Sequence, residues 1–251
     1  SDGVMRHPSF EGLREDKSAK EVVLETAADT GRTKKNQLIS PEQRVSGKTL
    51  LNPSEETQVK KVNGHELKFT NLSKVFWPKE KYTKRDLINY YHQMAPYILP
   101  YLKDRPQSMN RFPNGITGKS FYFKNITGQA QDWMDTYLYH SDTDNSDKHY
   151  LVGKDEATLL YMAGLGCIEM NPWSSTVKKP DHPTFCMIDL DPDRHTFDQV
   201  IAAALVTKDV LDEMGIGSYP KTSGSTGMHI YIPLGNKYTY EQSKEFARIV
   251  V

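Results

Sequence analysis

The stretch Phe185-Cys186-Met187-Ile188-Asp189-Leu190-Asp191-Pro192 decides the fold of this chain. Its apolar run lies between segments with helical spacing, so we expect an extended strand over Phe185–Leu190 with both faces covered. Pro192 ends the strand because proline lacks the backbone N–H that a sheet needs. A buried strand among amphipathic helices predicts a mixed α/β fold.

Two carboxylates, Asp189 and Asp191, lie at the end of this strand. Side chains of a strand alternate between its faces, so residues two apart share a face. Neighbouring carboxylates repel each other, and a divalent cation between them offsets the repulsion. Their hard oxygens suit Mn²⁺ or Mg²⁺. The pair predicts a metal site for two-metal phosphoryl transfer, which a third carboxylate usually completes.

Three other interpretations of the pair stay open. With Asp193 it imitates the start of an EF-hand loop, but Arg194 stands where that loop needs glycine. A phosphatase of the haloacid-dehalogenase type also begins with strand-Asp-x-Asp, but it usually continues with Gly-Thr rather than Pro-Asp. The third interpretation is a pair of plain surface carboxylates.

A glycine-rich segment, Lys221-Thr222-Ser223-Gly224-Ser225-Thr226-Gly227-Met228-His229, precedes a further strand. Its glycines allow a tight turn that exposes backbone N–H groups, and Ser223, Ser225 and Thr226 add hydroxyl donors. The segment predicts a cradle for a triphosphate on a strand next to the Asp pair. The alternative is an ordinary hairpin turn with a core histidine. It is not a Walker A loop, because no Lys-Ser/Thr follows the second glycine.

Charge is unevenly distributed along a chain whose formal net charge is zero. Between Lys60 and Lys124 there are 13 Lys and Arg residues and 4 Asp and Glu residues, whereas between Asn125 and Leu160 there are 2 and 7. A basic block in a neutral chain is typical of a surface that contacts a phosphate backbone. A solvated charged face is the alternative.

Within this block, Thr83 is expected to cap a helix, with Asp86 as its box partner. A lysine at a helix N-terminus favours phosphate binding, and exposed aromatic rings beside cations can stack on bases. Core aromatic residues and solvated lysines are the alternative. The candidate contacts to nucleic acid or nucleotide are Lys74, Lys84, Arg111, Phe121, Tyr122 and Lys124.

Composition along the chain predicts three segments: a short charged piece over residues 1–25, a flexible polar linker over 26–61, and a globular domain over 62–251. The two cysteines, Cys167 and Cys186, lie in apolar runs and are expected to be free thiols in a reducing compartment. No apolar run reaches about 18 residues, and no signal peptide is recognisable. We therefore expect a cytoplasmic protein.

The residues from about Val62 to Val251 resemble the polymerase domain of bacterial DNA ligase D, of the archaeo-eukaryotic primase superfamily. Residues 5–17 resemble the end of the ATP-dependent ligase module of the same protein. The motifs that carry the first resemblance are Asn71-Leu-Ser-Lys74, Tyr82-Thr-Lys84, Tyr90-Tyr91, Ala95-Pro96, Arg105-Pro106, Arg111-Phe-Pro-Asn-Gly115, Phe121-Tyr-Phe-Lys124, Glu169-Met-Asn-Pro-Trp173, Ile188-Asp-Leu-Asp-Pro192 and Ser223-Gly-Ser-Thr-Gly-Met-His229.

The resemblance implies a mixed central sheet with flanking helices. It also implies template-directed addition of ribo- or deoxyribonucleotides at broken DNA ends in nonhomologous end joining, with a manganese-type cofactor and a Ku-type partner. By motif, Asp189 and Asp191 would bind the metals, and His229 would act in the catalytic site. The triphosphate would contact Lys221, Ser223, Ser225, Thr226, His229 and Arg111. Lys74 and Lys84 would hold a 5′-phosphate of the downstream strand. Phe121 and Tyr122 would lie near the template base, and Arg111 and Lys124 would lie near nucleic acid or nucleotide.

Two departures from the family pattern qualify this expectation. Ser174-Ser175 stands where the family has a basic residue. The family's third metal-binding Asp is expected beyond Val251, so the domain is expected to be C-terminally incomplete and to bind DNA ends and nucleotides without full catalysis. A phosphate-ester hydrolase and a non-catalytic end-binding module stay open as alternatives. A ligase is excluded for these residues, because they contain no nucleotidyl-accepting lysine motif.

Overall fold

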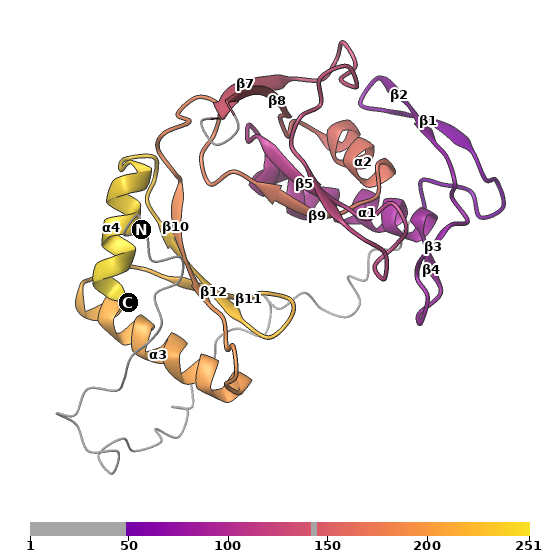
Figure 1. The fold of residues 1–251 in the computed structure, drawn as a ribbon. Coiled ribbons are helices and arrows are strands. Elements are labelled where there is room, and N and C mark those ends of the chain that lie inside the picture. Colours follow the sequence, from indigo (N-terminus) through magenta and orange to yellow (C-terminus); the bar gives the residue numbers. More distant parts are fainter. Residues whose placement is uncertain (1–48, 142–144) are drawn as a thin grey trace. The chain divides into compact units, whose positions relative to one another are not determined.

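The computed structural model describes residues 49–141 and 145–251 (Figure 1). The expected ligase tail and residues 26–48 of the expected linker lie outside the described residues. The elements are β1 (Gln58–Val62), β2 (His65–Phe69), β3 (Val75–Trp77), β4 (Tyr82–Thr83), α1 (Lys84–Leu102), β5 (Gln107–Arg111), β6 (Phe121–Phe123), β7 (Thr136–Ser141), β8 (Ser146–Leu151), α2 (Glu156–Gly164), β9 (Cys167–Pro172), β10 (Phe185–Leu190), α3 (Phe197–Glu213), β11 (Tyr219–Thr222), β12 (Met228–Pro233) and α4 (Tyr240–Val250).

The mixed α/β fold is confirmed, and the strands form small antiparallel sheets. The two three-stranded sheets have the orders β6-β5-β9 and β10-β12-β11, and the remaining strands form two-stranded pairs. No helix in the described part of the chain is long and apolar enough to cross a membrane.

The first hydrophobic core forms around α1 and α2 with the sheet β6-β5-β9. Helix α1 begins as its sequence predicts: the Thr83 side chain accepts from the backbone N–H of Asp86, and the Asp86 carboxylate accepts from the backbone N–H of Thr83. Ile88 on α1 and Leu159 on α2 are fully buried. This packing holds Lys84, the first residue of α1, at the edge of the core.

The second core lies on one face of the sheet β10-β12-β11, which α3 and α4 cover (Figure 1). Cys186 and Ile188 on β10 point into this core with Ile230 and Ile232 on β12. Met187 on the opposite face is 43% exposed. The expectation that both faces of this strand are covered is therefore wrong, since among the described residues only one face has helices packed on it.

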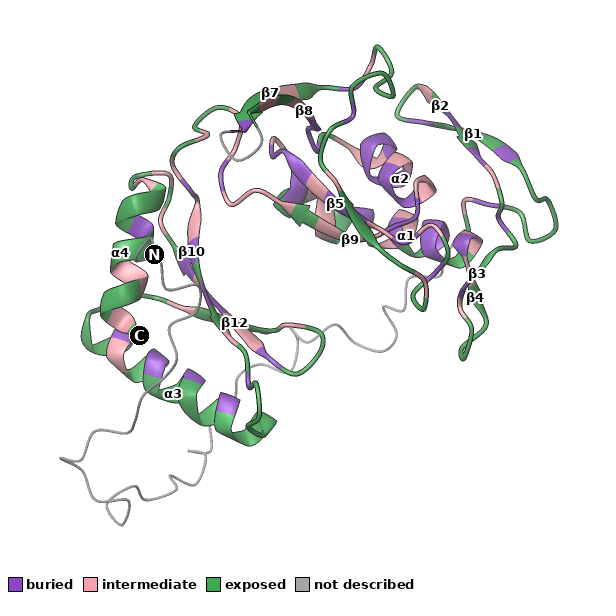
Figure 2. Cartoon of the chain, in the orientation of Figure 1, coloured by how far each residue is buried: buried purple, intermediate pink, exposed green. Residues whose placement is uncertain are grey.

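The folded domain begins earlier than the expected boundary at Val62. Leu51 is 1% exposed within the first core, Gln58 is buried, and β1 pairs with β2 over its whole length. Residues 49–61 are thus part of the domain and not of a linker. Their few apolar side chains are scattered among polar residues, so the sequence shows no sustained apolar period in this segment. The β7–β8 hairpin is a further element that the sequence did not predict, because β7 is mostly exposed (Figure 2) and the apolar side chains of β8 are confined to its C-terminal end.

Candidate functional site

Three residues from three strands line up on the open face of the sheet β10-β12-β11. Asp189 on β10 pairs in register with His229 on β12, and His229 pairs with Lys221 on β11. The Nε2 atom of His229 lies 3.5 Å from Oδ1 of Asp189. The Asp strand and the glycine-rich segment are therefore direct neighbours, as the sequence predicts.

The glycine-rich segment closes against the end of β10 at Gly227. A Cβ atom at this position would lie 2.6 Å from the carbonyl oxygen of Leu190 and 3.6 Å from Cα of Asp191. Only glycine permits this approach, because real Cβ atoms essentially never come within 3.0 Å of another heavy atom. The turn therefore lies directly against the segment that carries both carboxylates.

Ser223 holds the turn closed. Its backbone N–H donates to the carbonyl oxygen of Gly227 at 2.9 Å, and its hydroxyl oxygen accepts from the N–H groups of Gly227 and Ser225. Ser225 and Thr226 are exposed at the tip, and the Lys221 ammonium donates to the carbonyl oxygen of Thr222. The segment is a hairpin turn on which Lys221, Ser225 and Thr226 remain accessible for the predicted phosphate binding, whereas the Ser223 hydroxyl is engaged within the turn.

The alternative of an ordinary hairpin turn with a core histidine agrees with the structure in its first half only, because the segment is a hairpin turn but its histidine is not satisfied in the core. The side chain of His229 is 22% exposed, and its Nδ1 atom is buried without a hydrogen-bond partner among the described residues. A buried polar atom that lacks a partner is costly, so the described core does not satisfy the hydrogen-bonding capacity of this histidine.

The carboxylates meet one requirement of a cation site. The side chain of Asp189 is 58% exposed, and within the described ranges its only ion-pair contact is with His229. Burial, together with the nearby charge of Asp189, raises the pKa of Tyr231 on the same face. The carboxylate oxygens of Asp189 and Asp191 are the type of ligand that a hard divalent cation prefers. No cluster of three His, Cys, Asp or Glu ligands is found among the described residues.

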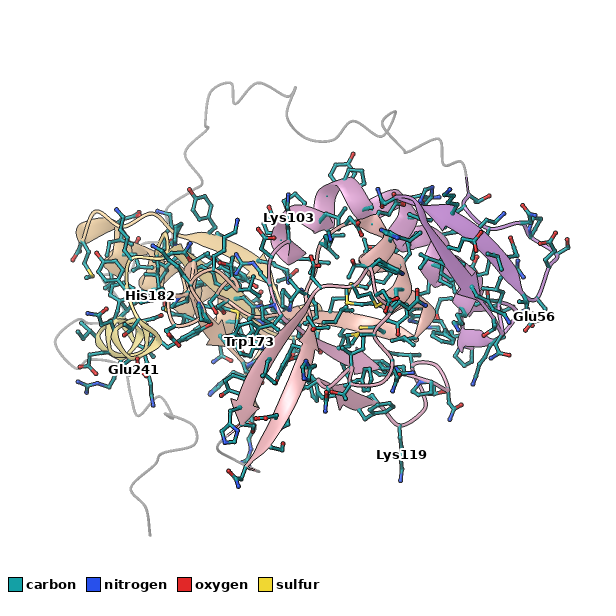
Figure 3. The ribbon with its side chains drawn as sticks, turned by 90° about the horizontal axis from the view of Figure 1, so that it is seen from above. Glu56, Lys103, Lys119, Trp173, His182 and Glu241 are labelled. Carbon is teal, nitrogen blue, oxygen red and sulfur yellow. The ribbon has the colours of Figure 1, made fainter. Side chains whose placement is uncertain are left out.

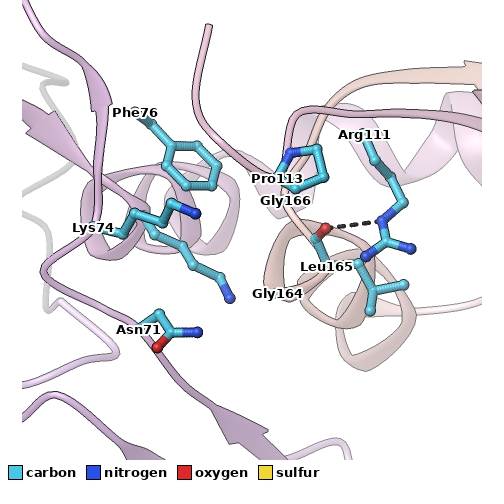
Figure 4. Close-up of a pocket in the computed structure, with 9 residues that line it drawn as sticks. Asn71, Lys74, Phe76, Arg111, Pro113, Gly164, Leu165 and Gly166 are labelled. Atoms are coloured by element: carbon cyan, nitrogen blue, oxygen red, sulfur yellow. Dashed lines mark hydrogen bonds between the residues drawn. The ribbon is translucent and has the colours of Figure 1, made fainter. Parts of the chain in front are cut away.

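A second site lies at the N-terminus of α1, where a cavity of about 270 Å³ contains three cationic side chains (Figure 4). Lys74 lies on one side of the cavity, and Arg111 lies on the other beside Leu165. Lys84 also lines the cavity and is only 9% exposed. The lining residues are Asn71, Lys74, Phe76, Lys84, Arg111, Pro113, Gly164, Leu165 and Gly166.

Each of the three cations is held by neutral groups. Lys74 donates to the amide oxygen of Asn114 at 2.8 Å, and Lys84 donates to the carbonyl oxygen of Thr70 at 3.0 Å. The Nε of Arg111 donates to the carbonyl oxygen of Leu165 at 2.9 Å. None of the described residues that line the cavity carries a carboxylate. The positive charges are thus fixed in place, and the nearby Glu56 carboxylate compensates them only in part, since its effect on the pKa of Lys84 is smaller than that of burial or of the other two cations.

The electrostatics of the cavity reflect this arrangement. Burial lowers the pKa of Lys84, and the charges of Lys74 and Arg111 lower it further. Burial also lowers the pKa of Arg111. The guanidinium of Arg111 lies 5.3 Å from the ring centroid of Phe121 and 4.9 Å from that of Phe123, so aromatic faces support it as well.

The residues proposed near a template base do not share one face. Phe121 pairs with Arg111 and lies on the side of the cavity, whereas Tyr122 pairs with Asn110 on the opposite side of the sheet. Lys124 follows Tyr122, with its ammonium 5.9 Å from that ring. The structure also groups Arg111 with Lys74 and Lys84, although the sequence assigned it to the triphosphate. That assignment of role stays a prediction.

Sequence reasoning missed the roles of several residues at the cavity and in the framework. Asn71 and Asn114 act at the cavity, and Arg105 is a buried structural residue that donates to the carbonyl oxygens of Trp173 and Ser174 and to the hydroxyl of Thr184. The positive φ angle of Asn71, 56°, is a local feature that asparagine tolerates. The contacts of Arg105 cross more than 65 residues of sequence and leave no local pattern.

Comparison with known proteins shows which family the chain belongs to. The model of the LigD primase-polymerase domain matches residues 83–251, which include most of the cavity lining and all of the open-face row. The chain belongs to the LigD primase-polymerase domain family. The resemblance inferred from the motifs is confirmed.

Similar proteins of this family are longer than the chain. It is 37% identical over 186 residues to the bifunctional non-homologous end joining protein LigD of Bacillus subtilis, covering 73% of the chain and 29% of that protein. It is 27% identical to the multifunctional LigD of Pseudomonas aeruginosa over 99% of the chain and 28% of that protein. The chain thus spans less than a third of these relatives.

A solved LigD primase-polymerase domain has the same fold. The polymerase domain of Mycobacterium tuberculosis ligase D, determined in complex with DNA, superposes with a TM-score of 0.64 at 25% identity. The match covers 72% of the chain and 66% of that domain.

Proposed function

We propose that this domain transfers nucleotides to DNA ends in nonhomologous end joining, and that it recognises the 5′-phosphate of the downstream strand. The observation that carries the proposal is the row of Asp189, His229 and Lys221 with Gly227 packed against Leu190. It brings carboxylates and the groups that we propose to bind phosphate to one end of one sheet. Membership of the LigD primase-polymerase family supports the same function.

In this proposal, Asp189 and Asp191 hold Mn²⁺ or Mg²⁺, which supplies charge stabilisation for the attacking 3′-oxygen and the pyrophosphate leaving group. Ser225 and Thr226 at the exposed tip, with Lys221, bind the triphosphate. His229, whose side chain is 22% exposed on the open face beside Asp189, donates to a phosphate oxygen. The protein contributes mainly by positioning these groups before reaction.

The cavity at α1 is proposed to bind the 5′-phosphate. A terminal phosphate carries nearly two negative charges at neutral pH, whereas an internal phosphodiester carries one. Three cations without a carboxylate among them favour the more highly charged group. DNA in the structure of the Mycobacterium tuberculosis domain supports contact with nucleic acid for this fold.

Nucleotide transfer is tested in two steps. Binding of a nucleoside triphosphate to the 251-residue chain should require Mn²⁺ and should be lost in Asp189→Ala and Asp191→Ala. Primer extension is then measured on a gapped duplex with a 5′-phosphate, using a chain lengthened past Val251 to include the expected third Asp. Extension that is insensitive to Asp189→Ala would refute the assignment, and cleavage of phosphate monoesters without a template would favour a hydrolase.

The phosphate pocket is tested by fluorescence anisotropy on two gapped duplexes that differ only in a 5′-phosphate or a 5′-hydroxyl. Lys74→Ala and Arg111→Ala should each reduce the preference for phosphate about tenfold or more, as expected for a charge-assisted hydrogen bond. Lys119→Ala is the matched control, since Lys119 belongs to the same basic block but projects away from the ribbon (Figure 3). Equal affinities for both duplexes in the wild type would exclude this role.

A further inference from the structure

We infer that Asn114 is a positioning residue that aims the Lys74 ammonium into the phosphate pocket, an inference that rests on the proposed 5′-phosphate recognition. The side-chain oxygen of Asn114 accepts a hydrogen bond from Nζ of Lys74 at 2.8 Å, although the two residues are 40 positions apart. Both side chains are exposed. An exposed lysine ordinarily samples many rotamers, so a fixed acceptor restricts where its charge lies.

The loop that carries Asn114 is clamped to the segment that carries Lys74. The backbone N–H of Ile116 donates to the carbonyl oxygen of Phe76 at 2.8 Å. Gly115 has a φ of +79°, and a Cβ atom there would lie 2.7 Å from the same oxygen. Phe76 is 1% exposed, so this anchor is part of the core. Asn114 is therefore held at a fixed place relative to Lys74.

The segment around Lys74 is equally well fixed. Its backbone N–H donates to the carbonyl oxygen of Asn71, and its own carbonyl oxygen accepts from the N–H of Lys84. Both ends of the Asn114–Lys74 hydrogen bond are thus tied to residues that line the pocket. Only the lysine side chain itself is free to move, and the amide limits that movement.

The chemistry of the amide suits this role. A neutral oxygen orients the ammonium but leaves its full charge available to a ligand, whereas a carboxylate would neutralise it. Lys84 and Arg111 are likewise held by carbonyl oxygens. Asn114 therefore completes a set of neutral supports, and it acts through Lys74 without contacting the phosphate.

The test is a double-mutant cycle on the 251-residue chain, read as the ratio of affinities for 5′-phosphate and 5′-hydroxyl gapped duplexes. Asn114→Ala should lower this ratio about three- to tenfold, while affinity for the 5′-hydroxyl duplex stays unchanged. In a Lys74→Ala background, Asn114→Ala should have no further effect, because coupled residues are not additive. Asn114→Asp should lower the ratio more than Asn114→Ala does.

Controls separate this inference from the proposed function. Asn52→Ala, at another exposed asparagine with a single, longer side-chain hydrogen bond, should leave the ratio unchanged. If Lys74→Ala lowers the ratio but Asn114→Ala stays within twofold of the wild type, the positioning role is overturned and phosphate recognition stands. If Asn114→Ala lowers the ratio equally with and without Lys74, it acts by another route and the inference fails. If Lys74→Ala has no effect, phosphate recognition itself fails. Thermal unfolding of each variant identifies any loss that is due to misfolding.

Discussion

Asp189 and His229 face each other across the antiparallel strands β10 and β12, with 3.5 Å between Oδ1 and Nε2. This separation exceeds that of a well-formed hydrogen bond. The two side chains are therefore neighbours that do not form a strong hydrogen bond with each other. The Asp189 side chain is more than half exposed. A ligand that approaches the open face of the sheet therefore meets an acceptor and a potential donor in adjacent positions.

The close approach of the glycine turn to β10 predicts a large effect of Gly227→Ala. The added Cβ would collide with the backbone oxygen of Leu190 at 2.6 Å, so the turn must move away from the carboxylates. We expect a loss of stability of about 1–3 kcal/mol, as for other overpacked sites. Mn²⁺-dependent nucleotide affinity should also fall about tenfold or more.

Gly217→Ala is the matched control, since a Cβ there meets nothing within 4 Å. Wild-type nucleotide binding by Gly227→Ala would contradict the proposed site.

Replacement of Asp189 by asparagine should have opposite effects with and without metal. Without divalent cations, Asp189→Asn removes repulsion between neighbouring carboxylates, so the melting temperature should equal or exceed that of the wild type. At Mn²⁺ 100-fold above its Kd, the wild type should gain about 2.7 kcal/mol, and the variant should gain little. Thermal unfolding with and without MnCl₂ measures both effects, with Asp181→Asn as an exposed control. An Mn²⁺ response retained in Asp189→Asn would remove Asp189 from the metal site.

The positive charge of Lys84 is expected to lower the stability of the folded state and to favour the proposed binding of a 5′-phosphate. Burial, Lys74 and Arg111 lower its pKa, so its charged form costs the folded state free energy at neutral pH. This cost is lost as the pH rises through the lowered pKa toward the ordinary lysine value of about 10.4. Relative to Lys84→Met, the wild type should therefore become more stable with rising pH.

Binding of the 5′-phosphate should show the reverse alkaline trend, because deprotonation of Lys84 would remove one of the cations that we propose to contact it. At acidic pH, affinity should fall again as the phosphate gains a proton near its second pKa of about 6. The preference for a 5′-phosphate, measured across pH, should thus pass through a maximum. A flat alkaline side in the wild type, or an alkaline decline that persists in Lys84→Met, would rule out Lys84 as the titrating group.

Phe121 and Tyr122 are expected to separate in function because they lie on opposite faces of their sheet. Phe121→Ala removes a ring that supports Arg111, so it should weaken the preference for a 5′-phosphate severalfold. Tyr122→Ala should leave that preference intact and affect only contacts made on its own face. Anisotropy on the paired duplexes measures both variants. Equal losses of the preference in the two would show that the faces do not act independently.

Local signals were sufficient to predict much of the framework. Helices α1, α3 and α4 begin after Thr83, Thr196 and Thr239, where a side-chain oxygen and a partner three residues later form a capping box. The adjacency of the Asp strand and the glycine-rich segment was predicted from their order along the chain and is seen in the register of β10 and β12.

Features that depend on distant contacts were not predictable. Leu51 is buried in the first core, but nothing in its polar surroundings marks it as a core residue. Arg105 is part of a basic block, yet its guanidinium binds carbonyl oxygens far along the chain. Period two distinguishes Phe121 from Tyr122 by face, but which face meets the cavity is decided by the pairing of β5 with β6. Conversely, Met187 is apolar but 43% exposed, because no described helix packs on its face of the sheet. The hydrophobicity of a strand does not reveal which of its faces is covered.

The neutral supports of Lys74, Lys84 and Arg111 have a practical consequence for handling the protein. Repulsion within a cluster of like charges that a nearby carboxylate compensates only in part is reduced when a small oxyanion from the buffer binds there. Inorganic phosphate or sulfate should therefore compete with DNA termini, and each should raise the midpoint of heat denaturation by mass action. Affinities determined in phosphate buffer will understate how strongly the protein distinguishes one kind of strand terminus from another.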